Sequence, residues 1–350
     1  MNDVKIKEKN SPKSQGKSEL VIEITQFCPQ ECIFCSSDAG PHQTTQLSLD
    51  EIRKIVLDAK KLQINSIHLS GGEPLSHPDM ELILDFLAEL DLPIVIYTCG
   101  IYQIDGKRTT LPENLIKKIS TIKNCIIRFN FQAASRDIFE EITQTPGSFK
   151  LAKQSLKLCK KYKIPREAHI VPTLLNLPVL KKTIRFLLKS GISKVKILRF
   201  VAQGRGEVKR SKVDPLVNPE LYWSTLNSLK NIYNPQQVEI GSAFSCRSNA
   251  HEACSAGIKK MAITPKYFVY PCVAFKSTKG RSLEGKSLIE ITHDTDFSPD
   301  FQRIKHSKCN DCYLEKECDE ICPKQIDLCN KFKSNSKIEE KNRVLLTQNS

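Results

Sequence analysis

Six strand-like runs alternate with helix-like patterns over residues 19–200, and this alternation limits the fold more than any other feature of the chain. The strand-like runs are residues 20–25, 66–70, 94–98, 125–131, 167–173 and 194–200. Helical patterns lie between them at residues 49–62, 80–90, 111–119, 149–162 and 177–189. Ser48 and Glu51 form a capping box for the first helix. Successive βα units predict a parallel sheet with helical crossovers, either open and doubly wound or closed into an incomplete barrel.

Three chemically distinctive segments each follow one of the first three predicted strands. They are the cysteine run Cys28 to Cys35, the turn Gly71-Gly72-Glu73-Pro74 and the turn Thr98-Cys99-Gly100. Ligands bind at the carboxyl ends of the strands in both open and barrel-shaped parallel sheets. We therefore expect the three segments to converge on one rim and to form the functional site.

The cysteine run Cys28-Pro-Gln-Glu-Cys32-Ile-Phe-Cys35 supplies three thiols within eight residues. A structural [4Fe–4S] cluster takes four cysteines, one for each iron. Three cysteines without a near fourth leave one iron open, and an open coordination position is typical of a catalytic metal site. A zinc site is the alternative, although zinc pairs usually close with a second pair. The spacing favours a catalytic iron–sulfur cluster.

A second group of cysteines lies in the last third of the chain. It consists of Cys246, Cys254, Cys272, Cys309, Cys312, Cys318, Cys322 and Cys329. The chain has 14 cysteines in all, and clustering of this kind indicates metal ligation rather than a disulfide framework. A Cys₄ zinc site is the alternative for part of this group. Cys125 and Cys159 lie in apolar or amphipathic runs, where we expect them to act as small buried hydrophobic residues.

Composition limits the class of protein and its location. The chain has 350 residues and 40% hydrophobic residues, enough for a large α/β domain and a smaller module. No apolar run is long enough for a membrane span, and the first 18 residues lack the apolar region of a signal peptide. We therefore expect a cytoplasmic protein without a membrane partner. The net charge of +14 would suit an acidic partner, but scattered lysines more often form a solvated face.

The pattern also divides the chain into segments. We predict a disordered basic tail over residues 1–18, a parallel α/β domain over 19–201, a linker with one helix over 202–241, a cysteine-rich domain over 242–330 and a polar tail over 331–350. A β-hairpin is expected at residues 263–272, with Pro265 and Lys266 in its turn. His169 is expected to be a strand residue with a hydrogen-bonded ring. Arg199 is expected either to bind an anion or to form a salt bridge.

Together, the cysteine spacing, Phe34 before the last cysteine and the glycine turn after the second strand resemble the radical S-adenosylmethionine (radical SAM) enzymes. This resemblance implies a partial (β/α)₆ TIM-type barrel over residues 19–201. It implies a [4Fe–4S] cluster on Cys28, Cys32 and Cys35, with SAM bound to the open iron. Cys99 replaces the Asn that many family members carry at the corresponding turn.

The resemblance also implies contacts with SAM. Phe34 would lie against the adenine, and the turn with Gly71, Gly72 and Glu73 would bind the methionyl amino group. From their positions at the ends of the third and fourth strands, further candidates for SAM contacts are Thr98, Asn130, Gln132 and Ser135.

The second cysteine group is similar to the SPASM extension of radical SAM enzymes, which houses auxiliary [4Fe–4S] clusters. This similarity implies one cluster on Cys309, Cys312, Cys318 and Cys329. It implies another cluster on Cys254, Cys272 and Cys322, with Cys246 as its fourth ligand. Tyr267 stands where the family often has Gly.

These features predict a radical SAM oxidoreductase or maturase that abstracts hydrogen from a peptide or protein side chain and passes electrons to the auxiliary clusters. An electron donor such as flavodoxin or ferredoxin would supply the reducing electron, and no nucleic-acid partner is expected. The alternative is a radical SAM dehydrogenase or epimerase of a sugar or nucleotide. A non-catalytic iron–sulfur or zinc protein remains a third reading.

Overall fold

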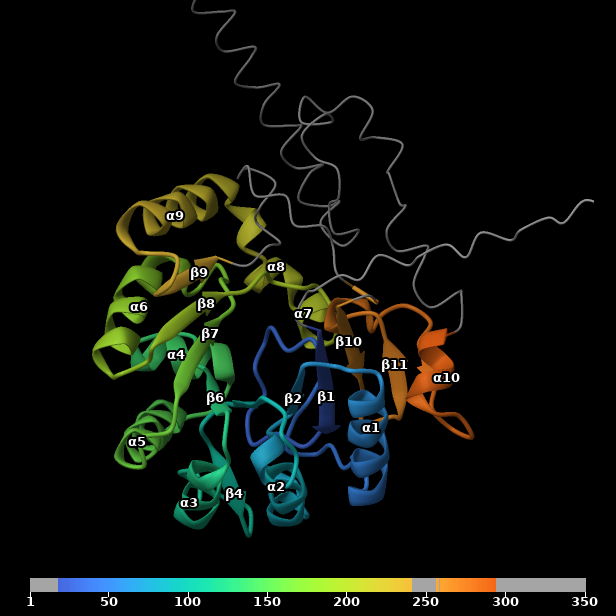
Figure 1. Cartoon of the computed structure of the whole chain (residues 1–350). Helices are drawn as coiled ribbons and strands as arrows, with labels where there is room; N and C mark the ends of the chain where they lie inside the picture. The colour runs from blue at the N-terminus through green and yellow to red at the C-terminus, as the bar shows by residue number, and fades with distance from the viewer. Residues whose placement is uncertain (1–17, 241–255, 258, 294–350) are drawn as a thin grey trace, which may run out of the picture.

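The computed structural model describes residues 18–240, 256, 257 and 259–293 (Figure 1). Six parallel strands form the centre of its main sheet, as the sequence predicts. They are β1 (Glu19–Thr25), β2 (Ser66–Gly71), β3 (Ile94–Thr98), β6 (Cys125–Asn130), β7 (Arg166–Ile170) and β8 (Lys194–Ile197). They pair in the order β1-β2-β3-β6-β7-β8, which is the order of an incomplete barrel.

Helices connect these strands and lie along the outer side of the curved sheet (Figure 1). They are α1 (Leu49–Lys61), α2 (Met80–Ala88), α3 (Glu113–Thr121), α4 (Arg136–Thr143), α5 (Ser148–Lys161) and α6 (Leu180–Lys189), with short 3₁₀ turns η1 (Pro74–Ser76) and η2 (Leu177–Val179). The predicted capping box is confirmed: Ser48 Oγ accepts a hydrogen bond from the Glu51 amide, and the Glu51 carboxylate accepts one from the Ser48 amide.

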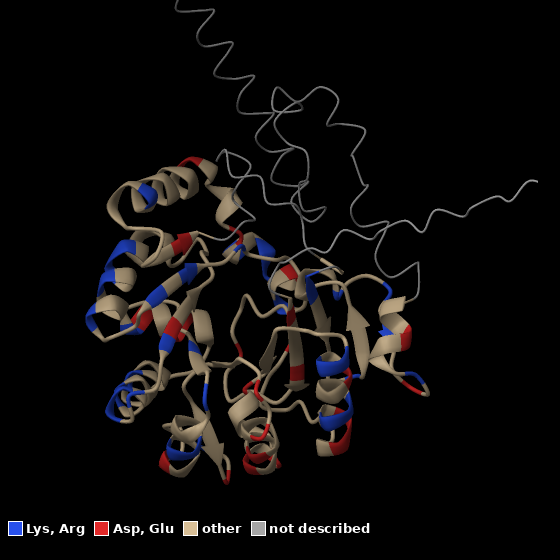
Figure 2. Cartoon of the chain, in the orientation of Figure 1, with Lys and Arg blue, Asp and Glu red and all other residues tan. Residues whose placement is uncertain are grey.

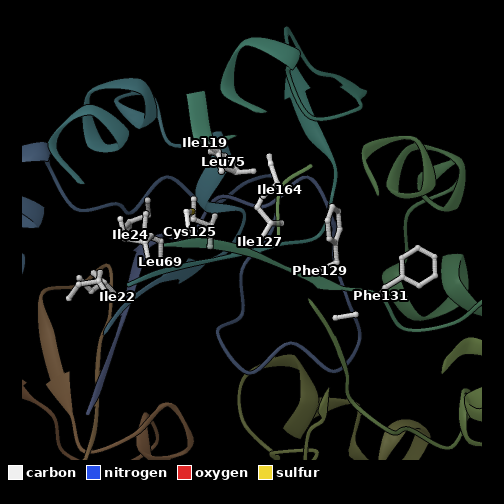
Figure 3. Close-up of a cluster of buried hydrophobic side chains, with 14 of the residues drawn as sticks. Ile22, Ile24, Leu69, Leu75, Ile119, Cys125, Ile127, Phe129, Phe131 and Ile164 are labelled. Atoms are coloured by element: carbon white, nitrogen blue, oxygen red, sulfur yellow. The ribbon is translucent and has the colours of Figure 1, made fainter. Parts of the chain in front are cut away.

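The two faces of the sheet differ in chemistry. Alternate strand residues such as Ile22, Leu69 and Ile127 are fully buried against the helices (Figure 3). Most residues between them are polar, and they include the buried side chains of His68 and Arg128. Because successive side chains on a strand point to opposite faces, the apolar positions form the core and the polar positions form a second, charged layer.

The sheet continues on both sides of the six central strands. β9 (Val238–Ile240) pairs parallel to β8, and β10 (Lys260–Ile263) pairs parallel to β1. β11 (Phe268–Tyr270) and β12 (Arg281–Ser282) complete the order β12-β11-β10-β1. The sheet therefore includes parts of the predicted linker and of the predicted cysteine-rich domain.

The predicted hairpin is present as the antiparallel pair β10 and β11. Tyr267, just before β11, has a φ of +61°, which lies in the left-handed region that glycine favours. The backbone there thus adopts the conformation that a glycine would allow, with tyrosine in its place.

The sequence did not predict α4 or the small sheet of β4 (Tyr102–Ile104) and β5 (Lys107–Thr109). α4 has only eight residues, and it is stabilised by tertiary packing. Phe139 is fully buried, and its ring lies 5.0 Å from Phe131 and 5.6 Å from Phe149. Strand β7 ends at Ile170, three residues earlier than expected, because the chain then turns: the Asn176 side chain accepts a hydrogen bond from the Thr173 amide.

The remaining described elements are short except for one helix. They are α7 (Arg205–Val208), α8 (Arg210–Val213), η3 (Pro215–Val217), α9 (Pro219–Ile232), η5 (Val273–Phe275) and α10 (Leu288–His293). None of the helices in the described residues is long and apolar enough to cross a membrane. Lys and Arg are spread over several helices and interspersed with Asp and Glu (Figure 2).

Candidate functional site

The cysteine loop, residues 28–40, is separated from β1 by two residues and folds back on itself. The Cys28 amide donates to the Gly40 carbonyl at 3.1 Å, and the Gly40 amide donates to the Gln26 carbonyl at 3.2 Å. The loop is also attached to α4, because the Ile33 amide donates to the Ile142 carbonyl at 2.9 Å. Both ends and the middle of the loop are thus fixed by backbone hydrogen bonds.

The three thiols of this loop lie close together and almost out of water. Cys28 and Cys32 are buried, and Cys35 is half-buried. Burial, with additional effects of Cys28 and Cys35, raises the pKa of the Cys32 thiol well above its ordinary value, and Arg205 opposes the rise. Burial also raises the pKa of Cys35, again against Arg205. A metal that binds these thiols must therefore displace their protons.

The donor set fits an iron–sulfur cluster. All three candidate ligands are sulfur atoms on one loop, as in clusters held by cysteine thiolates. In the part of the chain that the structure describes, no three His, Cys, Asp or Glu side chains are close enough to hold one metal ion. Three thiols that bind three different irons of one cluster need no common ion.

The glycine turn after β2 packs directly on the start of the cysteine loop. The Gly72 amide donates to the Thr25 carbonyl at 2.6 Å, and the Glu73 amide donates to the Phe27 carbonyl at 2.8 Å. A Cβ on Gly72 would lie 2.0 Å from the Phe27 oxygen, and a Cβ on Gly71 would lie 2.3 Å from the Thr25 oxygen. The glycines are therefore required for contact between two backbone segments, in addition to any contact with a ligand.

Glu73 joins the second and third segments through its buried carboxylate. Thr98 Oγ1 lies 2.9 Å from both carboxylate oxygens, and the Cys99 amide donates to one of them at 2.7 Å. The Leu75 amide donates at 3.2 Å. Burial raises the pKa of Glu73 to about 7, although these hydrogen bonds oppose the rise. Together with the hydrogen bond from the Glu73 amide to Phe27, these contacts bring the three segments together as expected.

Cys99 connects the third segment to the cysteine loop. Its side chain is buried with Cys28, Ala39 and Ile101. Burial raises the pKa of the Cys99 thiol well above its ordinary value, and a hydrogen bond with the Cys28 side chain adds to the effect. The cysteine that replaces the family's Asn thus contacts a predicted cluster ligand.

This geometry agrees with a comparison with known protein families. Residues 22–187 match the model of the Radical SAM superfamily. Those residues form a radical SAM domain. The family implies a [4Fe–4S] cluster and SAM as cofactors, and the three cysteines on the rim of the sheet supply the donors that such a cluster takes.

Curated relatives differ in their reactions. The "Probable GTP 3',8-cyclase" of Saccharolobus solfataricus is 24% identical over 214 residues, which cover 61% of this chain and 67% of the relative. The "AdoMet-dependent heme synthase" of Methanosarcina barkeri is 22% identical over 324 residues, which cover 85% of this chain and 89% of the relative.

Solved structures confirm the fold. SuiB of Streptococcus suis bound to S-adenosylmethionine has a TM-score of 0.69 at 17% identity, and the match covers 88% of this chain and 73% of SuiB. Native anSMEcpe with bound AdoMet has a TM-score of 0.68 at 15% identity, over 95% of this chain and 99% of that protein. The expectation of a partial TIM-type barrel is confirmed.

The other predicted SAM contacts lie at the end of β6, directly before α4 and in the cysteine loop. Asn130 ends β6, and its side-chain oxygen accepts a hydrogen bond from Gln132. Ser135 precedes α4 and makes no capping hydrogen bond. Phe34 is buried beside Cys32 and Ile142, on the α4 side of the loop. The contacts of these residues with SAM remain predictions.

Of the predicted auxiliary ligands, only Cys272 is among the described residues. It lies between β11 and η5, and its carbonyl accepts a hydrogen bond from the Phe275 amide. The predicted ligands outside the described residues are Cys246, Cys254, Cys309, Cys312, Cys318, Cys322 and Cys329. Cys125 and Cys159 are buried, and burial raises the pKa of each thiol to about 12, which fits their expected packing role.

The prediction for His169 was wrong in one respect. The ring is buried and lies 5.2 Å from the Tyr97 ring, but its Nε2 has no hydrogen-bond partner among the described residues. Burial, with the charges of Arg128 and Lys196, lowers the pKa of His169 well below its ordinary value. The domain therefore holds an imidazole with an unpaired Nε2 in its charged layer, near the ion pair between Arg128 and Glu167.

Sequence reasoning missed Arg205, which contacts the cysteine loop from α7 of the chain. Its Nε donates to the Cys32 carbonyl at 3.1 Å, and its Nη1 lies 3.1 Å from an Asp38 carboxylate oxygen. The run Gln203-Gly204-Arg205-Gly206 contained a signal, because two glycines around an arginine allow close backbone contact. The sequence did not show what that backbone contacts.

Proposed function

We propose that this protein is a radical SAM enzyme that modifies a peptide or protein side chain by hydrogen abstraction. The observation that carries the proposal is the convergence of the cysteine loop, the glycine turn and the Thr98 turn on one rim of a radical SAM domain. Cys28, Cys32 and Cys35 would hold a [4Fe–4S] cluster. When bound there, the cluster and SAM supply a 5′-deoxyadenosyl radical that abstracts hydrogen from the substrate.

The chain's own residues would prepare this chemistry. The Glu73 carboxylate accepts hydrogen bonds from the Leu75 and Cys99 amides. It would thereby keep the turns after β2 and β3 in position when SAM binds. The nearly complete burial of Cys28 and Cys32 would limit access of water to the cluster. Exclusion of water protects reactive intermediates from side reactions.

Two fold relatives support a peptide substrate. SuiB has been solved bound to the precursor peptide SuiA, and anSMEcpe with AdoMet and the Cp18Cys peptide. Both resemble this chain over 88% or more of its length. Cys272, together with the cysteines beyond the described residues, would hold the auxiliary clusters that accept or relay the substrate's electron.

A small-molecule substrate is the second candidate. The similarity to the heme synthase spans 85% of this chain, and the GTP 3',8-cyclase acts on a nucleotide by its name. On this reading the enzyme would be a dehydrogenase, an epimerase or a related enzyme of a metabolite, with the same first step.

Anaerobic reconstitution of the full chain tests the proposal. We expect about twelve irons, four for each of three clusters, and reductive cleavage of SAM to 5′-deoxyadenosine. Cys32→Ala should abolish cleavage, whereas Cys125→Ala, a buried cysteine outside the site, should retain it. Wild-type protein that holds iron but never cleaves SAM under strong reductant would refute the proposal.

The substrate class needs a second measurement. Deuterium should pass from a labelled substrate into 5′-deoxyadenosine. Transfer from labelled peptides, and not from labelled nucleotides or tetrapyrroles, would support a peptide substrate. The opposite pattern would establish the small-molecule alternative.

A further inference from the structure

The Arg205 side chain contacts the cysteine loop at three points. Its Nε donates to the Cys32 carbonyl, its Nη1 pairs with the Asp38 carboxylate, and its Nη2 donates to the Ala39 carbonyl. Asp38 has a φ of +52°, which is uncommon for a residue other than glycine. Arg205 thus contacts the loop on both sides of Cys35, including its strained position.

The backbone around Arg205 is pressed against the same loop. A Cβ on Gly204 would lie 2.8 Å from the Cys35 carbonyl oxygen, and a Cβ on Gly206 would lie 3.0 Å from the Phe34 carbonyl oxygen. The Gly206 amide donates to the Cys35 carbonyl at 3.4 Å. Side chains at either glycine would push this segment away from the cysteines.

The same region is tied to the segment that follows Cys272. The Gln203 side chain donates to the Val273 carbonyl at 3.1 Å and accepts from the Ser277 amide at 3.0 Å. Lys276 Nζ lies 2.7 Å from the Glu23 carboxylate and 2.7 Å from Ser37 Oγ, in a buried ion pair. The cysteine loop is therefore held by contacts with two segments, residues 203–206 and residues 273–277.

Arg205 also brings a positive charge to the ligands. Its Nε lies 3.1 Å from the carbonyl oxygen of Cys32, one of the three proposed cluster ligands. A reduced iron–sulfur cluster carries one more negative charge than the oxidised cluster, and net charge near a cluster is one of the factors that set its reduction potential. A nearby cation should therefore stabilise the reduced state.

We propose that Arg205 is a positioning residue of the cluster site: its guanidinium fixes the cysteine loop, and its charge makes the bound cluster easier to reduce. This inference rests on the proposed function, because it assumes a cluster on Cys28, Cys32 and Cys35. It goes beyond the family's three cysteines by assigning a role to a residue that lies outside the matched residues 22–187.

The test compares wild type with R205Q, R205K and R210Q in the full chain, reconstituted anaerobically. Arg210 is the control, because it is an arginine five residues further along the chain whose side chain pairs with Asp214 and Glu207. A potentiometric titration is followed by electron paramagnetic resonance. The signal that changes on addition of SAM is measured, because it belongs to the cluster with the open iron. Loss of iron to a chelator is measured in parallel.

We expect R205Q to lower the ratio of reduced to oxidised cluster about tenfold at a fixed potential, as for a unit charge within about 10 Å at an effective dielectric constant near 20. This corresponds to a midpoint potential about 59 mV more negative for one electron. R205K keeps the charge, so its ratio should stay within about threefold of wild type, but it cannot make all three contacts and should lose iron at least about threefold faster. R210Q should behave as wild type.

An unchanged ratio in R205Q, or an R205K variant that keeps its iron as well as R210Q, would overturn the inference. If R205Q holds no cluster, the inference is tested by R205K alone: faster loss of iron than from R210Q supports it, and an equal rate overturns it. Wild-type protein without a SAM-responsive signal would instead refute the proposed function, so the two failures are distinguishable.

Discussion

Replacing Gly72 with alanine should dislodge the glycine turn from the cysteine loop. The new Cβ would lie 2.0 Å from the Phe27 carbonyl oxygen and 2.5 Å from its carbon, both of them backbone atoms that no side-chain rotation can move. Relief of this overlap requires the two segments to separate by more than about 1 Å. A hydrogen bond of ordinary length does not survive such a shift, since contacts beyond about 3.6 Å no longer count.

Two backbone hydrogen bonds, each with one buried partner, would then be lost, from the Gly72 amide to Thr25 and from the Glu73 amide to Phe27. Each unsatisfied group costs about 1–3 kcal/mol, so their combined loss is about 4 kcal/mol. Alanine recovers about 0.4–1 kcal/mol by restricting the unfolded chain. The difference between this loss and this gain predicts that the free energy of unfolding falls by about 3 kcal/mol.

Urea denaturation of the full chain, with thiols kept reduced, measures this change. Gly40→Ala is the matched control, because Gly40 lies in the same site but its Cβ would meet nothing closer than 3.8 Å. Its free energy of unfolding should stay within about 0.5 kcal/mol of wild type. If G72A and G40A unfold at the same urea concentration, the steric reasoning is wrong.

Three further perturbations probe the surroundings of the site. Burial raises the pKa of Glu73 to about 7, above its ordinary 4.5, so the unfolded chain loses this proton first as pH rises. Between those pH values the free energy of unfolding of wild type, measured by urea denaturation, should fall by up to about 3 kcal/mol relative to that of E73Q. Parallel pH profiles of the two proteins would contradict this. Glu167→Gln leaves the buried Arg128 cation without its charged partner and should lower the free energy of unfolding by about 3–5 kcal/mol. A decrease below about 1 kcal/mol would show that the pair is solvated. Phe139→Ala should cost about 3–5 kcal/mol and speed proteolysis at α4, and unchanged proteolysis would count against tertiary packing as the cause of this helix.

Local sequence signals were sufficient for the βα framework. The capping box of Ser48 and Glu51 begins α1 where the spacing predicts, and short apolar runs marked the six central strands. These features depend on residues that are neighbours along the chain. The end of β7 was missed because it depends on a turn held by the Asn176 side chain.

The convergence of the three segments was predictable from topology, since parallel strands place their carboxyl ends together. The contacts that hold the segments together were not predictable. The Glu73 carboxylate meets donors 25 and 26 residues away, and Arg205 meets carbonyls more than 160 residues away. No periodicity or motif encodes such distant pairs. The unpaired Nε2 of His169 was missed for the same reason, because the surroundings of this ring come from several strands.

The pairing of β10 with β1 bears on where the chain can be cut. The family match ends at residue 187, but Glu19, Leu20, Val21 and Ile22 of β1 align with Lys260, Met261, Ala262 and Ile263 of β10. A fragment that stops before β10 would leave β1 as an exposed edge strand, with unpaired backbone groups that invite aggregation. β1 is also the strand that leads into the cysteine loop. The segment that matches the family model is therefore smaller than the unit of folding, and work on the radical SAM domain should retain the chain to at least β12.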